Sequence, residues 1–321
     1  MRTLNIPDSG YILLAALLWG TSFPVIDYAL QHVHPTVLLT IRFGLASVIA
    51  IGMFPKTIFR VFTFRPLFVV GILNAAGYFI QFFGQTAVPA GVASVLVNSY
   101  TLLVPVFAYM LIREKITCIN IGAAVVGIVG LAMAAFSSEQ DSVKITPDYL
   151  VGAGLVYSAG VLWALYNVYA KKIQSAESSG STGGSGISYR DIFVASMAYT
   201  FLLGLAGVLW FSPSLDAVAL ISASLPALYL AVFCSVIPFQ LYLRSLAKTS
   251  VFIASIMLLT QVIVAFFISI LFLGEPASIV QVIGIIIVTC SVAVVVVSPS
   301  SEKVVEETIS SKKSDGTAEE Y

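Results

Sequence analysis

Ten runs of mostly apolar residues, each about 20 residues long, dominate this sequence. A helix of that length spans the hydrocarbon core of a bilayer. Only 10% of the 321 residues are charged, which is too little to cover a water-exposed surface, since soluble domains carry about 25%. We expect transmembrane helices at Gly10–Ala29, Pro35–Met53, Leu67–Val88, Val92–Ile112, Ile119–Phe136, Tyr149–Ala170, Ile192–Trp210, Leu225–Ser245, Val251–Leu273 and Ile279–Val297.

The charge balance argues against a nucleic-acid-binding protein, and the spacing of the cysteines and histidines argues against a metal site. Sixteen Lys and Arg are balanced by 16 Asp and Glu, so there is no basic excess to bind nucleic acid. The three cysteines stand alone, and His32 and His34 have no further ligand nearby. Because a metal site needs three or more ligands, we expect no metal and no cofactor. No ATP-binding G-x-x-x-x-G-K-[ST] motif occurs.

Lys and Arg sort to one side of the membrane. If the N-terminus is cytoplasmic, the inner segments hold 14 of the 16, the outer loops hold Lys144, and Arg42 lies within the second span. Cytoplasmic loops are enriched in these residues. The pattern therefore predicts a multi-pass protein of the plasma membrane with both termini in the cytoplasm.

The two halves of the chain resemble each other. Val92-Ala93-Ser94 recurs 161 positions later as Ile253-Ala254-Ser255, and Ile112-Arg113-Glu114 recurs as Leu273-Gly274-Glu275. Because each half has five spans, the second enters the membrane from the opposite side, as in many transporters. We expect an all-α integral membrane protein with ten transmembrane helices in two inverted five-helix repeats. The expected divisions are a first repeat over 1–136, an outer loop over 137–148, a second repeat over 149–297 with a Ser/Gly-rich loop near 175–188, and a disordered tail over 298–321.

Short motifs follow one another in order through both repeats. They are Trp19-Gly20-Thr21-Ser22-Phe23, Arg42-Phe43, Pro105 with Glu114, Gly122 with Gly127 and Gly130, Trp163, and Leu273-Gly274-Glu275. In these motifs the chain resembles the EamA-type, ten-helix branch of the drug/metabolite transporter superfamily. It departs from the pattern at Phe266, where a second proline matching Pro105 is expected. The resemblance implies export or uptake of small metabolites, often amino acids.

Polar residues inside the spans are the candidate substrate contacts, because buried polar groups in a bilayer usually face a cavity or a partner helix. Asn74, Tyr78, Gln81 and Gln85 share one helical face, as do Ser94, Asn98, Thr101 and Pro105. Tying helices together is the alternative role of these side chains. The predicted substrate-binding set is Trp19, Asn74, Tyr78, Gln81, Asn98, Thr101, Trp163, Tyr166, Asn167, Gln240 and Gln261.

Few charges lie within or at the ends of the spans. Asp27 and Arg42 are well inside adjacent helices, so they form an ion pair or Asp27 couples transport to a proton. Glu114 and Glu275 occupy matching helix ends and are expected to be structural caps. Pro105 lacks an N–H and frees the carbonyl of Thr101.

These features favour a secondary transporter that moves amino acids or related neutral, zwitterionic or amphipathic compounds, in the export direction, by alternating access. A channel-like membrane protein and an intramembrane enzyme are the alternatives. The sequence contains no filter loops, paired aspartates or H-E-x-x-H motif, so we do not expect an enzyme. The expected partners are a small-molecule substrate, the lipid bilayer and, in the coupled alternative, a proton. The transporter is expected as a monomer or a homodimer.

Overall fold

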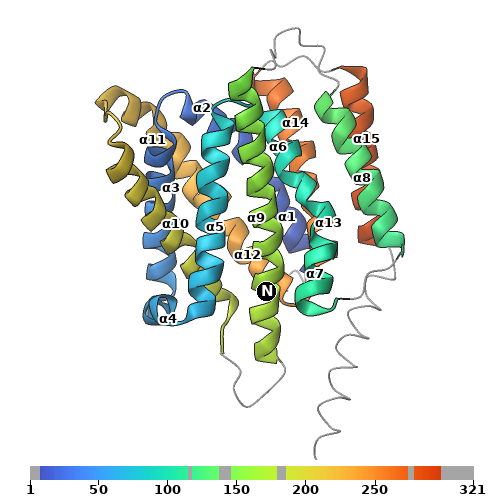
Figure 1. The fold of residues 1–321 in the computed structure, drawn as a ribbon, viewed down its shortest axis with the longest axis horizontal. Coiled ribbons are helices and arrows are strands. Elements are labelled where there is room, and N and C mark those ends of the chain that lie inside the picture. The colour runs from blue at the N-terminus through green and yellow to red at the C-terminus, as the bar shows by residue number, and fades with distance from the viewer. Residues whose placement is uncertain (1–7, 115–117, 137–145, 179–185, 274–277, 298–321) are drawn as a thin grey trace, which may run out of the picture.

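The computed structural model describes residues 8–114, 118–136, 146–178, 186–273 and 278–297, and it contains only helices and connections within these ranges (Figure 1). The α-helices are α1 (Asp8–Gly20), α2 (Ser22–Leu30), α3 (Pro35–Met53), α4 (Ile58–Thr63), α5 (Arg65–Gln85), α6 (Ala90–Asn98), α7 (Val104–Ile112), α8 (Cys118–Phe136), α9 (Pro147–Ser178), α10 (Tyr189–Phe211), α11 (Ala217–Ala231), α12 (Ile237–Leu246), α13 (Val251–Met257), α14 (Thr260–Leu273) and α15 (Ile279–Val297). Three short elements complete them: η1 (Pro55–Thr57), η2 (Ser99–Leu102) and η3 (Val232–Val236).

These elements form the expected membrane architecture. Among the described residues, eight helices are long and apolar enough to cross a membrane, and two shorter apolar stretches lie within α8 and α15. Together they account for the ten predicted spans, in two inverted repeats of five. The protein is therefore an all-α, multi-pass membrane protein, as the sequence predicts.

Four of the ten spans are broken. The first span is interrupted at Thr21, between α1 and α2. The fourth is interrupted by the 3₁₀ turn η2, the eighth by the π-helical turn η3, and the ninth at Leu258–Leu259. Such interruptions inside a membrane are tolerated where the backbone is buried in protein or faces a cavity.

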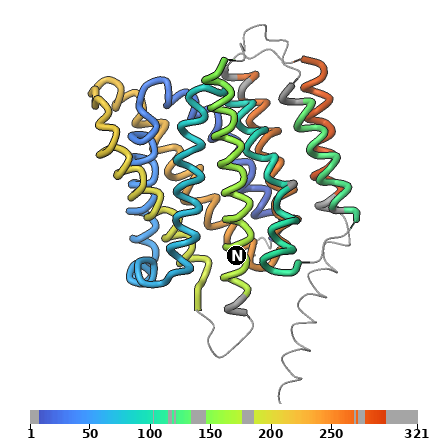
Figure 2. The backbone as a smooth tube through the Cα atoms, viewed as in Figure 1, coloured from blue at the N-terminus to red at the C-terminus, as the bar shows by residue number. Residues whose placement is uncertain are grey.

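The two repeats are interleaved rather than side by side. Figure 2, in the same view as Figure 1, shows the blue α3 and the cyan α5 of the first repeat among the yellow and green helices of the second. α3 packs on α10, α5 on α9, and α8 on α15. In the last pair a Cβ on Gly130 would lie 2.6 Å from the carbonyl oxygen of Gly284, so the close approach of these helices requires glycine.

Some of the predicted boundaries shift or cannot be compared. α9 continues to Ser178, so the predicted loop near 175–188 begins later than expected. Its residues 179–185, most of the loop over 137–148, and the tail over 298–321 lie outside the described residues. The short helix α4 was not predicted; it lies at the same end of the bundle as the lower ends of α5 and α9 (Figure 1).

Candidate functional site

A cavity of about 50 Å³ lies between six of the ten spans, three from each repeat. Its walls come from α1, α2, α5 and the α6–η2 region of the first repeat, and from α9, α12 and the α13–α14 break of the second. All of its lining side chains are uncharged. They are Trp19, Ser22, Phe23, Tyr78, Gln81, Val97, Tyr100, Trp163, Tyr166, Asn167, Phe239, Leu258 and Gln261.

Aromatic rings form most of the cavity wall and contact each other edge to face. The Tyr78 and Trp163 ring centroids are 4.8 Å apart, and those of Trp163 and Tyr166 are 5.6 Å apart. Phe239 lies 5.2 Å from Trp19, and so connects the two indoles across the repeats. Such contacts hold large side chains in place and present apolar faces to a ligand.

Amide side chains supply the polar part of the wall. Gln261 of α14 donates to the Asn98 side chain of α6 over 3.3 Å, a hydrogen bond between the repeats. Gln81 donates to Gln85 over 3.0 Å within α5. Each of these contacts uses one amide N–H, which orients the side chain. Neutral amides of this kind recognise hydroxyl, amino or carbonyl groups without adding charge.

A carbonyl freed by proline joins the repeats beside the cavity. Pro238 has no N–H, so it cannot donate to the carbonyl of Cys234, four residues earlier. That oxygen instead accepts from Trp19 Nε1 and from Arg42 Nη2, each over 3.0 Å. The same turn contains Ser235, which accepts from Arg42 Nε over 2.9 Å. The π-helical turn η3 is thus held by two side chains of the first repeat.

A family model described as the EamA-like transporter family matches residues 9–136 and 150–297. The chain belongs to the EamA-like transporter family. The two matched stretches correspond to the two five-helix halves around the cavity. The description of this family and the names of the matching relatives are those of transporters.

Individual relatives are distant. An uncharacterized transporter of Clostridium kluyveri is 28% identical over 64% of this chain, and the match spans 63% of that relative. The uncharacterized transporter YvbV of Bacillus subtilis is 22% identical over 93% of this chain and 95% of its own length. A probable amino-acid metabolite efflux pump of Escherichia coli is 26% identical over 52% of this chain and 54% of its own. A solved crystal structure with 17% identity superposes with a TM-score of 0.72, covering 92% of this chain and 98% of the other, and so shares the fold.

Seven of the eleven residues predicted to bind substrate lie in the cavity wall of this EamA protein. They are Trp19, Tyr78, Gln81, Trp163, Tyr166, Asn167 and Gln261. Sequence reasoning missed Ser22, Phe23, Val97, Tyr100, Phe239 and Leu258. Ser22 and Phe23 belong to the family motif and Tyr100 stands next to a candidate, but the apolar members carry no periodic polar signal.

The other four predicted residues, Asn74, Asn98, Thr101 and Gln240, lie outside the cavity wall. Asn74 donates to Ser196 and Thr200 of α10 and so ties two helices together. Asn98 is wholly buried behind Gln261, and Thr101 donates to the carbonyl of Ser255. Gln240 contacts Met53 at an exposed position. Buried amides and hydroxyls serve helix packing as readily as ligand binding, and spacing alone does not separate the two.

The expected ion pair between Asp27 and Arg42 does not form. Asp27 accepts from Gln31, the residue that follows the end of α2. Arg42 is wholly buried and directs its guanidinium to the Cys234–Ser235 turn instead. The freed carbonyl at Cys234 competes for Arg42, which the sequence pattern of the second helix does not reveal.

Glu114 has the capping geometry expected of it. Its carboxylate accepts from the Ser250 hydroxyl and from the backbone N–H groups of Val251 and Phe252, at the first turn of α13. A carboxylate there stabilises the helix N-terminus, and in this case it also links α7 to the opposite repeat. Pro105 follows η2 at the start of α7, as its missing N–H predicts. Glu275 lies outside the described residues.

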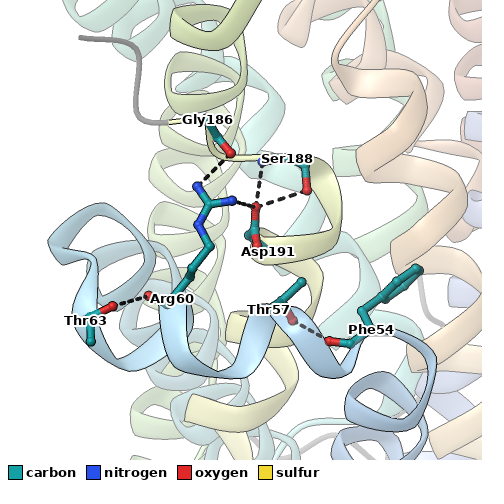
Figure 3. Close-up of polar contacts among 7 residues, drawn as sticks. All are labelled: Phe54, Thr57, Arg60, Thr63, Gly186, Ser188 and Asp191. Carbon is teal, nitrogen blue, oxygen red and sulfur yellow. Dashed lines mark hydrogen bonds and ion pairs between the residues drawn. The ribbon is translucent and has the colours of Figure 1, made fainter.

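The end of the bundle that carries α4 has a further polar link between the repeats (Figure 3). Arg60 of α4 forms an ion pair of 3.2 Å with Asp191 and donates to the carbonyl of Gly186 over 2.7 Å. Asp191 also accepts from the backbone N–H of Ser188, and so caps α10. Lys171 of α9 donates to the carbonyls of Leu246 and Ala247 at the end of α12. These contacts join α4 to the start of α10, and α9 to the end of α12.

Proposed function

We propose that the protein is a secondary transporter that exports small metabolites across the plasma membrane by alternating access. The observation that carries the proposal is the cavity itself, which is lined by three spans from each of two inverted repeats. In transporters built from inverted repeats, the substrate site lies near the bilayer midplane between the repeats. Rocking one repeat against the other would open this cavity to each side in turn.

The broken spans support the same mechanism. The cavity wall includes the α1–α2 region, the residues beside η2 and the α13–α14 break. Discontinuous helices supply backbone groups to substrate and act as hinges. A packed bundle without transport function has no need for breaks at these depths.

The proposed substrates are amino acids or related neutral, zwitterionic or amphipathic compounds. The uncharged lining and the aromatic wall suit such molecules, and the Escherichia coli relative named a probable amino-acid metabolite efflux pump supports this class and direction. The proposed orientation, with both termini in the cytoplasm, follows from the concentration of Lys and Arg at one end of the bundle.

Counterflow in proteoliposomes tests the proposal. Vesicles preloaded with unlabelled amino acids should accumulate the matching labelled amino acid without an applied gradient. Gln81→Leu should reduce this uptake about tenfold, as loss of a buried polar contact to substrate costs about 1–3 kcal/mol. Gln240→Leu is the matched control because Gln240 lies outside the cavity wall. Equal uptake by both variants and the parent would contradict the site, and no counterflow across an amino-acid and amine panel would contradict the function.

A proton gradient tests whether transport is coupled to protons, and impermeant thiol reagents test the proposed topology. If Asp27 couples a proton, an imposed pH gradient drives transport in the parent but not in Asp27→Asn. Equal transport with and without the gradient excludes coupling.

The topology is tested in a cysteine-free background. Ser212→Cys should react with an impermeant maleimide in intact cells, and Thr63→Cys should react only after permeabilisation. The reverse pattern would invert the topology.

A further inference from the structure

Arg42 is a buried cation next to the cavity, and its surroundings do not neutralise it. Its side chain is 0% exposed. Two of its nitrogens donate to Ser235 and to the Cys234 carbonyl, while Nη1 has no hydrogen-bond partner. Its guanidinium carbon also lies 4.9 Å from the ring centroids of Phe43 and Tyr78.

No carboxylate balances this charge in the part of the chain that the structure describes. The ion pairs found there join Arg60 to Asp191 and Lys248 to Asp8. Arginine stays protonated in proteins, and a charge inside a membrane domain is costly unless it is paired. Neutral hydrogen bonds and aromatic faces reduce this cost but supply no opposite charge.

The guanidinium lies one layer behind the cavity wall. Arg42 Nη2 and Trp19 Nε1 donate to the same carbonyl oxygen, each over 3.0 Å, so the two nitrogens are at most about 6 Å apart. Trp19 and Tyr78, the latter in contact with the guanidinium, both line the cavity. Since no charged side chain lines the cavity, Arg42 dominates its electrostatic potential, and a low-dielectric site transmits that potential strongly.

We propose that Arg42 determines the charge selectivity of the site, so that the preferred substrate carries one carboxylate placed against the Trp19 and Tyr78 wall. This inference rests on the proposed function and narrows it to small monocarboxylates with an apolar body. The aromatic rings pack on that body, and the carboxylate supplies the negative charge that the protein lacks near Arg42. Organic cations of the same shape are disfavoured.

Three planar molecules of nearly equal shape separate charge from fit: benzoate, benzamide and benzamidinium. Trp19 and Trp163 line the cavity, whereas Trp210 is 84% exposed. In a Trp210→Phe background, therefore, tryptophan fluorescence reports on the cavity. We expect purified protein at pH 7 to bind benzoate about tenfold more tightly than benzamide, and benzamidinium more weakly than either.

Variants at the partner of Arg42 test the cause without removing the arginine. Ser235→Asp places a carboxylate where Ser235 now accepts from Arg42 Nε, and it should abolish the preference for benzoate over benzamide. Ser235→Asn, which has the same shape without charge, should keep it. Arg42→Lys should also keep it, and Arg42→Gln should lose it.

Two results would overturn the inference. The first is equal binding of benzoate and benzamide by the parent, and the second is an equal loss for all three molecules in Ser235→Asp and Ser235→Asn, the signature of a purely structural Arg42. In either case the proposed transport stands, because benzamide binding still reports an accessible cavity. If none of the three molecules changes the fluorescence, the cavity assignment fails together with the inference.

Discussion

The fourth span, in the first repeat, and the ninth span, in the second repeat, both break at matching positions. Only the fourth span contains a proline. In the fourth span the 3₁₀ turn η2 precedes Pro105. In the ninth, Leu259, Gln261 and Val262 each donate to the carbonyl three residues back, a tight turn at Leu258–Leu259 without proline. Phe266 stands where Pro105 is matched. The break therefore follows the packing around the cavity, and proline reinforces it in one repeat only.

The largest effect on stability is expected from Phe266→Pro, which gives the ninth span the proline that the fourth span has. Phe266→Pro puts proline in the interior of α14, where it removes the bond to the carbonyl of Val262. We expect a loss of about 3 kcal/mol in the free energy of unfolding. Denaturant titration of purified protein followed by circular dichroism measures it. A variant as stable as the parent would show that α14 already tolerates a second break.

A somewhat smaller effect is expected where the fifth span of each repeat meets its counterpart. Gly130→Ala directs a methyl group against the carbonyl of Gly284 and should cost about 1–3 kcal/mol. Gly122, in the same helix, provides the matched control Gly122→Ala, because a Cβ at this position would have no neighbour within 4 Å. Thermal midpoints in detergent compare the two. Equal midpoints would mean that α8 and α15 separate without cost.

The helix-end carboxylates test whether the repeats are equivalent in capping. Glu114→Gln keeps the shape but weakens three hydrogen bonds at the start of α13, and we expect a loss of about 1–2 kcal/mol. Glu275→Gln is the sequence-matched comparison. Similar losses in thermal midpoint would show that both carboxylates cap helices in the same way. A loss only in Glu114→Gln would show that this cap exists in one repeat only.

The smallest effect concerns the caps of the second span in each repeat. His34 caps α3 by accepting from the N–H of Thr36, and burial lowers the pKa of its imidazole below the usual value. The neutral form is thus favoured in the folded protein, so stability falls as pH decreases through about 6.5. His34→Asn should flatten the dependence of the thermal midpoint on pH between 7 and 5. The surface variant His32→Asn should leave it unchanged, and a flattening in both would assign the effect elsewhere.

α10, the counterpart of α3, depends on a different cap. Ser188 and Asp191 form its capping box, and Arg60 pairs with Asp191. Two helices at matching positions of the repeats are therefore capped by different side chains, a histidine in α3 and a serine–aspartate pair in α10.

The sequence by itself determined the membrane class, the ten spans and the two five-helix halves, because the length of apolar runs and the period of a repeat are local properties. It also selected most of the cavity wall, since polar and aromatic side chains inside lipid-spanning helices are rare. Only the tertiary structure separated Gln81, which faces the cavity, from Asn74 on the same stripe, which binds α10. The partner of Arg42 was decided in the same way: a carbonyl freed by Pro238, 196 residues further along the chain, lies closer than Asp27. Spacing places a side chain on a helix face, but the neighbouring helix decides what that face contacts.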